Sequence, residues 1–300
     1  LIWPPAGPTA YCSRRSRGVS RPRRTGERLA VPDEPMKPME SVAPTSPSPD
    51  TTGVSVIVIT RDEEHVIADC LESVRWADEI VVLDCGSTDR TVQICRTFTD
   101  RVYETDWPGF GIQKNRALSH ATRDWVLSLD ADEQVTPDLA EEIQNQLPHT
   151  RANGLVIPFR SSYLGRFMRH GDWRNESHLR LFRRTTGRFS DDAVHERLIV
   201  DGEIGALVNP ILHHSFATVE EVQDKVNRYS TAGAERRFAS GKRSSLLKAL
   251  SHATWTFLRG YVLKAGFLDG REGFLLAVSN AEGSYYTYLK LLYLRENASR

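Results

Sequence analysis

Two carboxylates that stand two residues apart after a short apolar segment are the strongest sign of chemistry in this sequence. Asp130 and Asp132 directly follow residues 125–129 (WVLSL), a run that is too short for a helix and predicts a buried strand. In open α/β sheets, ligands bind at the carboxyl ends of strands. Two carboxylates repel each other there unless a cation compensates, and Mg²⁺ or Mn²⁺ bridging phosphate oxygens suits this task. The alternative is a solvated acidic turn before a helix that Thr136 and Pro137 are suited to begin.

Polar residues also follow two earlier strand-like segments. Residues 54–59 and 80–83 are apolar and rich in β-branched side chains, which is typical of buried strands. The first segment runs into TRDEE and the second into DCGSTD, where Ser87 or Thr88 is expected to cap a helix that begins near Asp89. Both sets of polar side chains are therefore expected at strand ends.

Strands and helices alternate up to about residue 150. The first helix is expected to run through Trp76, and a weaker strand at 101–104 precedes a helix that carries residues 113–115 (QKN). This alternation predicts parallel βαβ units of a nucleotide-binding kind. The chain lacks the Gly-x-Gly-x-x-Gly of dehydrogenases after its first strand and the Gly-x-x-x-x-Gly-Lys-Ser/Thr of P-loop enzymes, which argues against both classes.

The composition fits one large domain with appendages. Of the 300 residues 40% are hydrophobic, and the 39 basic and 39 acidic side chains balance, so no nucleic acid is expected as a partner. No apolar run reaches the roughly 18 residues of a spanning helix, which leaves surface attachment to a membrane open. The four cysteines show no metal-binding spacing and are expected to be reduced thiols in a cytosolic protein: Cys12, Cys70, Cys85 and Cys95.

Residues 1–52 differ from the rest of the chain. They are rich in Pro, Ser, Thr and Arg and have no periodicity, so a disordered tail is expected. Their arginines could contact nucleic acid or anionic lipid, but a tail without function is the simpler expectation. Because Met36 and Met39 lie near its end, the tail could also be translated from upstream of the real start.

Several segments together resemble the inverting GT-A glycosyltransferases of family 2, and especially the branch of lipopolysaccharide core β-1,4-glucosyltransferases. The resemblance covers about residues 53–295 and implies a GT-A fold. Such a fold has a mostly parallel nucleotide-binding sheet flanked by helices, here with C-terminal amphipathic helices. The family usually has Asn-Glu-Glu after the first strand, and Asp62 replaces the Asn here, which is expected to leave the fold intact. The segments that carry the resemblance are 54–64, 84–89, 113–115 and 129–133 (LDADE).

The resemblance also implies roles for these side chains around a nucleotide diphosphate sugar, with a UDP-sugar expected. Asp84 would receive the base, with a purely turn-capping Asp as the alternative. Asp132 would bind the metal, which holds both phosphates, and Asp130 would contact ribose or metal-bound water. Lys114 could add positive charge near the phosphates, or could be a solvated helix lysine. The other residues expected around the donor are Thr60, Asp62 and Glu64.

The acceptor is expected at residues 151–216. An inverting transferase needs one base to take the proton from the acceptor hydroxyl. Residues 189–196 (FSDDAVHE) are close to the family's Val-His-Glu segment, so Glu196 is the first choice, Asp192 the second and Asp191 a distant third. The alternative for Glu196 is an ion pair with a nearby Arg.

Two neighbouring histidines complete the expected site. The resemblance implies that His213 is a further metal ligand, although a lone His is more often structural. His214 is expected to be a neighbour rather than a ligand. Residues 163–169 (YLGRFMR) are basic and aromatic, which suits either a loop over an anionic acceptor or an amphipathic surface piece.

The last third of the chain is expected to be helical. Residues 219–239 have amphipathic spacing, and residues 244–264 mix Lys and Arg with Trp, Phe, Tyr and Leu, as in helices that lie in a membrane interface. A turn at 266–274 and a last helix at 274–295 follow. The alternative is that these helices pack on the catalytic domain and dimerise.

We therefore predict a metal-dependent, inverting hexosyltransferase that moves glucose from UDP-glucose onto a lipid-linked envelope saccharide such as lipopolysaccharide core. It would work in the cytoplasm, at the inner face of the bacterial inner membrane. The alternatives are transfer to a polyprenyl phosphate and a non-catalytic, membrane-bound saccharide-binding scaffold, against which the acidic residues argue. The expected organisation is a tail at 1–52, a catalytic domain at 53–216 (donor half 53–150, acceptor half 151–216) and a helical extension at 217–300.

Overall fold

The computed structural model describes residues 53–190 and 196–298, and the tail expected at 1–52 lies outside them. The strands are β1 (Val54–Thr60), β2 (Glu79–Asp84), β3 (Val102–Glu104), β4 (Trp125–Asp130), β5 (Glu133–Val135), β6 (Gly154–Tyr163), β7 (Arg166–Phe167), β8 (Ser177–Arg183), β9 (Gly187–Phe189), β10 (Leu198–Val200), β11 (Ile204–Ala206) and β12 (Ile211–Phe216). The α-helices are α1 (Ile67–Glu72), α2 (Thr91–Cys95), α3 (Phe110–His120), α4 (Pro137–Gln146), α5 (Val219–Ala239), α6 (Leu246–Leu258) and α7 (Gly270–Ala298).

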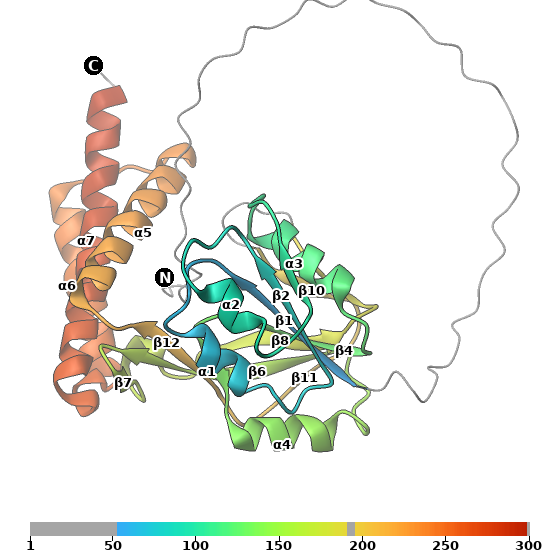
Figure 1. Cartoon of the computed structure of the whole chain (residues 1–300). Coiled ribbons are helices and arrows are strands. Elements are labelled where there is room, and N and C mark those ends of the chain that lie inside the picture. The colour runs from blue at the N-terminus through green and yellow to red at the C-terminus, as the bar shows by residue number, and fades with distance from the viewer. Residues whose placement is uncertain (1–52, 191–195, 299–300) are drawn as a thin grey trace, which may run out of the picture.

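One mixed sheet forms the centre of the fold, in the order β3-β2-β1-β4-β8-β6-β12-β5 (Figure 1). The first four strands run parallel, β8 is antiparallel to both of its neighbours, and β12 returns parallel to β6. Helices cover the parallel strands on both faces. The predicted α/β fold with a mostly parallel sheet flanked by helices and with C-terminal helices is confirmed.

The first strand shows why both faces must be covered. Every residue of β1 is buried, and successive side chains of a strand point to opposite faces. Val56 and Val58 belong to the core under α1, α2 and α4, whereas Ile57 and Ile59 belong to the core under α3. A continuous apolar run, rather than an alternating one, is the sequence that such a strand needs.

The parallel pairing aligns the strand ends at one edge of the sheet. In the register of β1 with β2, Thr60 lies opposite Asp84, and in the register of β1 with β4, Ile59 lies opposite Asp130. Because the side-chain period of a strand is two, a slip of one residue would turn these polar ends to the other face. The apolar strands thus fix the position of the polar residues.

Some local details differ from the sequence-based expectations. Helix α1 ends at Glu72 instead of Trp76, and the residues after it form turns. The N-cap residue of α2 is Arg90 rather than Ser87 or Thr88, and the Asp89 carboxylate just before it accepts from the Thr91 backbone N–H at 2.9 Å. Asp reaches the free N–H groups of a first turn as readily as Ser or Thr does.

Strand β5 is a further difference, because no strand was expected directly after the acidic pair. It pairs with β12 in antiparallel register, with His213 opposite Glu133. The helix expected next is confirmed: Thr136 caps α4 by accepting from the Leu139 backbone N–H at 3.2 Å, and Pro137 is its first residue. This short strand carries the acidic segment across the sheet to β12.

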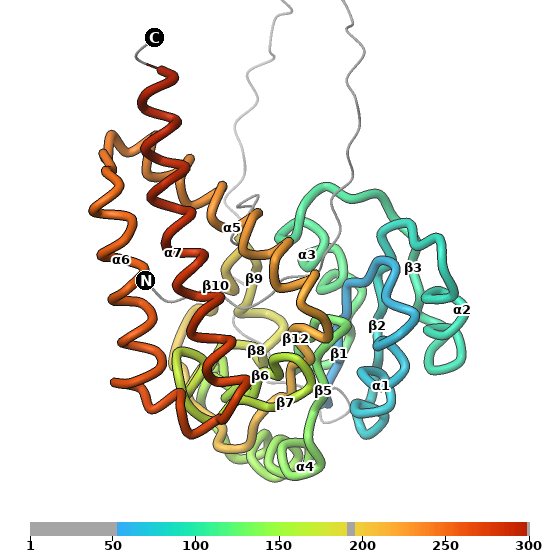
Figure 2. Tube along the Cα trace, turned by 90° about the vertical axis from the view of Figure 1, so that its left-hand side faces the viewer, coloured from blue at the N-terminus to red at the C-terminus, as the bar shows by residue number. Residues whose placement is uncertain are grey.

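Three long helices follow β12 and stand together at one end of the sheet (Figures 1 and 2). A capping box formed by Thr218 and Glu221 begins α5. The helix expected at 244–264 ends as an α-helix at Leu258 and continues as a π-helical turn over Arg259–Leu263, and α7 begins at Gly270 rather than at residue 274. In the part of the chain that the structure describes, no helix is long and apolar enough to cross a membrane.

Candidate active site

Polar side chains end three neighbouring strands at the same edge of the sheet. Thr60 ends β1, Asp84 ends β2 and Asp130 ends β4, and all three are buried. The Thr60 hydroxyl is buried and has no hydrogen-bond partner among the described residues. A buried polar atom of this kind is expected to bind something, because an unmade hydrogen bond costs free energy.

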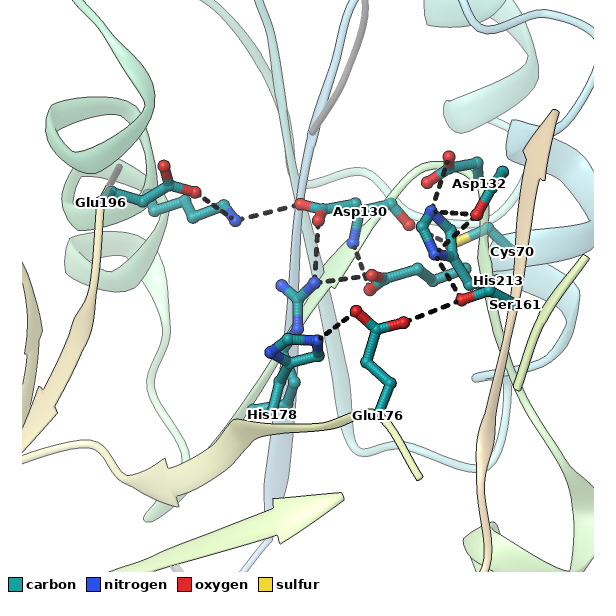
Figure 3. Close-up of polar contacts among 12 residues, drawn as sticks. Cys70, Asp130, Asp132, Ser161, Glu176, His178, Glu196 and His213 are labelled. Carbon is teal, nitrogen blue, oxygen red and sulfur yellow. Dashed lines mark hydrogen bonds and ion pairs between the residues drawn. The ribbon is translucent and has the colours of Figure 1, made fainter. Parts of the chain in front are cut away.

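Two cations hold Asp130 (Figure 3). Lys114 Nζ lies 3.0 Å from its Oδ1, and Arg180 Nη2 lies 2.9 Å from its Oδ2. Burial disfavours the ionised carboxylate, but these two cations outweigh it and lower the pKa of Asp130. Asp130 therefore enters any reaction as a fixed, compensated charge rather than as a free carboxylate.

Lys114 links Asp130 to Glu196, the candidate base. Its Nζ also lies 3.1 Å from Glu196 Oε1, and the lysine is itself buried in α3. The solvated-lysine alternative is thus wrong, and the cation that pairs with Glu196 is Lys114 rather than an Arg. Glu196 and Asp130 lie on opposite sides of the same ammonium group (Figure 3).

The rest of the segment 113–115 fixes the chain that leads to Glu196. The Asn115 amide donates to the Phe189 backbone carbonyl at 2.8 Å and accepts from its N–H at 2.9 Å. At Gly111, a Cβ atom would lie 1.9 Å from the Ser190 backbone oxygen, so the close approach of α3 to this segment requires glycine. Asn115 thus fixes the end of β9, while Lys114 itself holds Glu196 opposite the strand ends.

Arg180 was not expected in the site. It projects from β8, and its Nη2 lies 2.6 Å from Glu133 Oε1, while Glu133 Oε2 accepts from the Asp130 backbone N–H at 2.9 Å. Burial together with the charge of Asp130 raises the pKa of Glu133, although Arg180 opposes this shift. Polar and apolar side chains alternate in residues 178–183 (HLRLFR). This pattern predicts that Arg180 faces one side of its strand, but it does not tell which side.

Asp132 and His213 lie together on the side of Asp130 that is away from Glu196 (Figure 3). His213 Nε2 lies 3.2 Å from Asp132 Oδ2, the His213 ring is buried, and the Asp132 side chain is 23% exposed. The Asp132 backbone carbonyl accepts from the His214 N–H at 3.0 Å, which ties the acidic turn to β12. Ser161 and Ser215 hydroxyls lie 3.2 and 3.1 Å from His213 Nδ1, so the ring is held in place.

Comparison with known proteins decides the family. The profile of glycosyl transferase family 2 matches residues 55–199. The lipopolysaccharide core biosynthesis glycosyltransferase LpsC of Rhizobium meliloti is 30% identical over 246 residues, which make up 79% of this chain and 91% of LpsC. The chain belongs to glycosyltransferase family 2. An uncharacterized glycosyltransferase of Rickettsia typhi is 28% identical over 260 residues, covering 81% of this chain and 87% of that protein.

Solved structures show more distant likenesses. Staphylococcus aureus TarS 1–349 overlaps with a TM-score of 0.41 and 16% identity, over 82% of this chain and 91% of that one. Glucosyl-3-phosphoglycerate synthase from Mycobacterium tuberculosis, in complex with Mg²⁺ and UDP, overlaps with a TM-score of 0.32 and 25% identity, over 39% of this chain and 45% of that one.

The three other acidic residues expected around the donor of this family 2 enzyme are engaged in turns. Asp84 Oδ2 accepts from the Gly86 and Ser87 N–H groups at 2.9 and 2.8 Å, which is the turn-capping alternative. Asp62 has a left-handed backbone (φ 53°), a conformation that both Asp and Asn tolerate, so the Asp fits where the family usually has Asn. Glu64 accepts from the Arg90 N–H and Nε at 3.1 and 3.2 Å.

The structure thus brings Thr60, Asp130, Asp132, Glu196 and His213 to one edge of the sheet, with Lys114 among them. Asp62, Glu64 and Asp84 line the adjoining turns. The second and third choices for the base, Asp192 and Asp191, lie outside the described residues.

A divalent metal, which we expect from the sequence, fits one part of this edge. Within residues 53–190 and 196–298, no three His, Cys, Asp or Glu side chains could hold a metal ion by themselves. Asp132 and His213 supply two ligand atoms that are close enough to reach one cation. Two protein ligands are a suitable number where substrate phosphates and waters supply the others, as is usual for Mg²⁺.

Glu63 adds negative charge to the same place and was missed from the sequence as a site residue. It follows β1, and its partial burial is the largest cause that raises its pKa to about 7, followed by the charges of Asp132, Asp89 and Asp62. A carboxylate whose pKa is raised by neighbouring carboxylates indicates a region of excess negative charge. A cation that binds there would relieve the repulsion.

The raised pKa of Glu63 predicts a pH-dependent stability. The unfolded chain loses this proton near pH 4.5 and the folded chain near pH 7, so Glu63 lowers the free energy of unfolding progressively as the pH rises between those values. The free energy of unfolding of Glu63→Gln minus that of the wild type should therefore be larger at pH 8 than at pH 4.5. Urea unfolding of both proteins in metal-free buffer measures this difference. An equal difference between the two proteins at both pH values would contradict this account.

Proposed function

We propose that this family 2 glycosyltransferase is metal-dependent and inverting, and that it transfers glucose from UDP-glucose to a lipid-linked envelope saccharide such as lipopolysaccharide core. The observation that carries the proposal is the arrangement around Asp130. The Asp132–His213 pair lies on one side of it, and the Lys114–Glu196 pair lies on the other (Figure 3). This arrangement offers a place for a leaving diphosphate and, across from it, a place for a base.

In this proposal Glu196 is the base. Its Oε1 is held by Lys114 at 3.1 Å, which leaves Oε2 to take the proton from the acceptor hydroxyl. The acceptor oxygen then bonds to the anomeric carbon while the bond from that carbon to the diphosphate oxygen breaks, with its electron pair on the departing diphosphate. Attack from the face opposite the leaving group inverts the configuration.

The donor would lie along the strand ends. The free Thr60 hydroxyl and the turn at Asp84 suit the nucleoside, and Asp132 with His213 would hold Mg²⁺ or Mn²⁺ against the diphosphate. Such a cation binds phosphate oxygens and takes up the charge that develops on the leaving group. Within this scheme, residues 53–150 form the donor half and residues 151–216 the acceptor half.

The proposed lipid-linked acceptor is supported by the relative's name and by the surface of α6. LpsC is named for lipopolysaccharide core biosynthesis. Helix α6 packs on α7 as the outer helix of the 217–300 extension (Figure 2), and Ala249 is its one buried residue. Leu247 and Trp255 are 78% and 55% exposed. The other exposed apolar residues of α6 and of the turns after it are Leu246, Leu250, Leu258, Val262, Leu263, Phe267 and Leu268.

Basic side chains accompany this apolar face. Lys242 and Arg243 are exposed between α5 and α6, and Lys248 is exposed in the first turn of α6. An apolar face edged by Lys and Arg is typical of helices that lie in the interface of an anionic membrane. We therefore propose that this face rests on the inner surface of the bacterial inner membrane and brings the site to its acceptor.

The donor site predicts metal-dependent nucleotide binding. UDP, UDP-glucose, GDP-mannose and ADP-heptose are titrated calorimetrically with and without Mn²⁺. UDP-glucose should bind more than tenfold more tightly with Mn²⁺, and Asp132→Ala should lose this gain because a ligand is missing. Asp138→Ala, an equal change of charge at an exposed position of α4, should behave like wild type. Binding that ignores Mn²⁺, or no nucleotide binding at all, would contradict the proposal.

The membrane face predicts lipid-dependent binding. Wild type should sediment with vesicles of phosphatidylglycerol and phosphatidylethanolamine and much less with phosphatidylcholine, because Lys and Arg attract anionic headgroups. Leu247→Glu combined with Trp255→Glu should abolish sedimentation. Val208→Glu, at a residue that is 79% exposed but lies between β11 and β12, is the matched control and should sediment fully. Equal sedimentation of all three proteins would sink the assignment of this face.

A further inference from the structure

Lys225 is a buried cation that the proposed chemistry has not used. It lies in α5, its side chain is 4% exposed, and in the described part of the chain it makes no ion pair or hydrogen bond. Its Nζ lies 4.7 Å from the ring centroid of Phe216 and 5.3 Å from that of Tyr229. Burying an ammonium group without an acceptor costs free energy, and a methionine would fill the same space without that cost.

The position of Lys225 relates it to the metal side of the site. Helix α5 follows directly after β12, the strand that carries both His213 and Phe216 (Figure 1). Because its ammonium packs on Phe216, three residues after His213 in β12, Lys225 is on the His213 side of Asp130, whereas Lys114 is on the Glu196 side. The charges that act on its ammonium are those of Asp132 and Glu176, which are acidic, and of Arg228, which is basic.

The charge of Lys225 depends on what lies next to it. Burial, helped by Arg228, lowers the pKa of this lysine to about 7, while Asp132 and Glu176 oppose the shift. An added anion nearby would raise the pKa and favour the charged form. A lysine in this state is suited to receive a ligand that brings negative charge.

We propose that Lys225 binds a diphosphate oxygen of the nucleotide-sugar donor and stabilises the departing nucleoside diphosphate. This inference rests on the proposed function. A diphosphate held by a cation at Asp132 and His213 would lie beside β12, and the Lys225 ammonium, which packs on Phe216 of the same strand, offers three N–H donors to its oxygens. When the bond to the anomeric carbon breaks, the electron pair stays on the diphosphate, and Lys225 stabilises that charge without giving up a proton.

The test compares Lys225→Met with Lys242→Met, which removes the same charge from an exposed position between α5 and α6. UDP-glucose and uridine are titrated calorimetrically at saturating Mn²⁺. Lys225→Met should bind UDP-glucose about 10- to 100-fold more weakly, as expected for one hydrogen bond to a charged group, and uridine as wild type does. Lys242→Met should match wild type for both ligands. Lys225→Gln is the second variant if Lys225→Met does not fold.

Proton uptake gives a readout that a purely structural lysine would not move. At pH 8 and saturating Mn²⁺, the wild type should take up more protons on binding UDP-glucose than Lys225→Met does, because the diphosphate raises the pKa of the lysine from about 7. The number of protons taken up is obtained from titrations in two buffers of different ionisation enthalpy. Its difference between the two proteins separates the contribution of Lys225 from those of Glu63 and His213.

The possible failures are distinguishable. If the wild type binds no nucleotide, the proposed function fails and this inference fails with it. If the wild type shows metal-dependent binding but Lys225→Met binds UDP-glucose equally well, the role of Lys225 is overturned and the proposed function stands. Equal weakening of uridine and UDP-glucose, or equal proton uptake in both proteins, would also overturn a contact with the diphosphate.

Discussion

The site depends on the compensation of one buried charge. Asp130 ends a strand that is buried on both faces, and an unpaired carboxylate there would cost several kcal/mol. Lys114 from α3 and Arg180 from β8 supply the compensation, and each of them also holds a second carboxylate. Asp130 therefore joins β4, α3 and β8, and through Lys114 it sets the position of Glu196.

The two ends of this charge network differ in a way that suits group transfer. On the Lys114 side, each carboxylate already has a cation. On the side of Glu63 and Asp132, the carboxylates repel one another, and the nearby cation Lys225 has no partner among the described residues. A metal–diphosphate complex would supply both the positive charge that the carboxylates lack and the negative charge that the lysine lacks. Substrate binding would complete the electrostatics of the site.

Much of this could be predicted from the sequence because it depends on local pattern. The buried strands at 54–59, 80–83 and 125–129 follow from apolar runs, and Asp130 and Asp132 stand where such a strand ends. Arg180 and Lys225 could not be predicted, because nothing local says that a polar side chain on β8 or a lysine on α5 faces the sheet edge. Strand β5 was missed because the strand with which its three residues pair, β12, lies more than 70 residues later in the sequence.

The most direct test of the account is the turnover of Glu196→Gln. The amide keeps the size of the side chain and an oxygen for Lys114, but it cannot take a proton. UDP release from UDP-glucose is followed at saturating Mn²⁺ with lipopolysaccharide truncated in its inner core, and UDP-glucose affinity is measured in parallel. The account predicts transfer by the wild type, a loss of at least about 100-fold in the variant, and donor affinity within about threefold of wild type. Turnover by Glu196→Gln close to that of the wild type would contradict it.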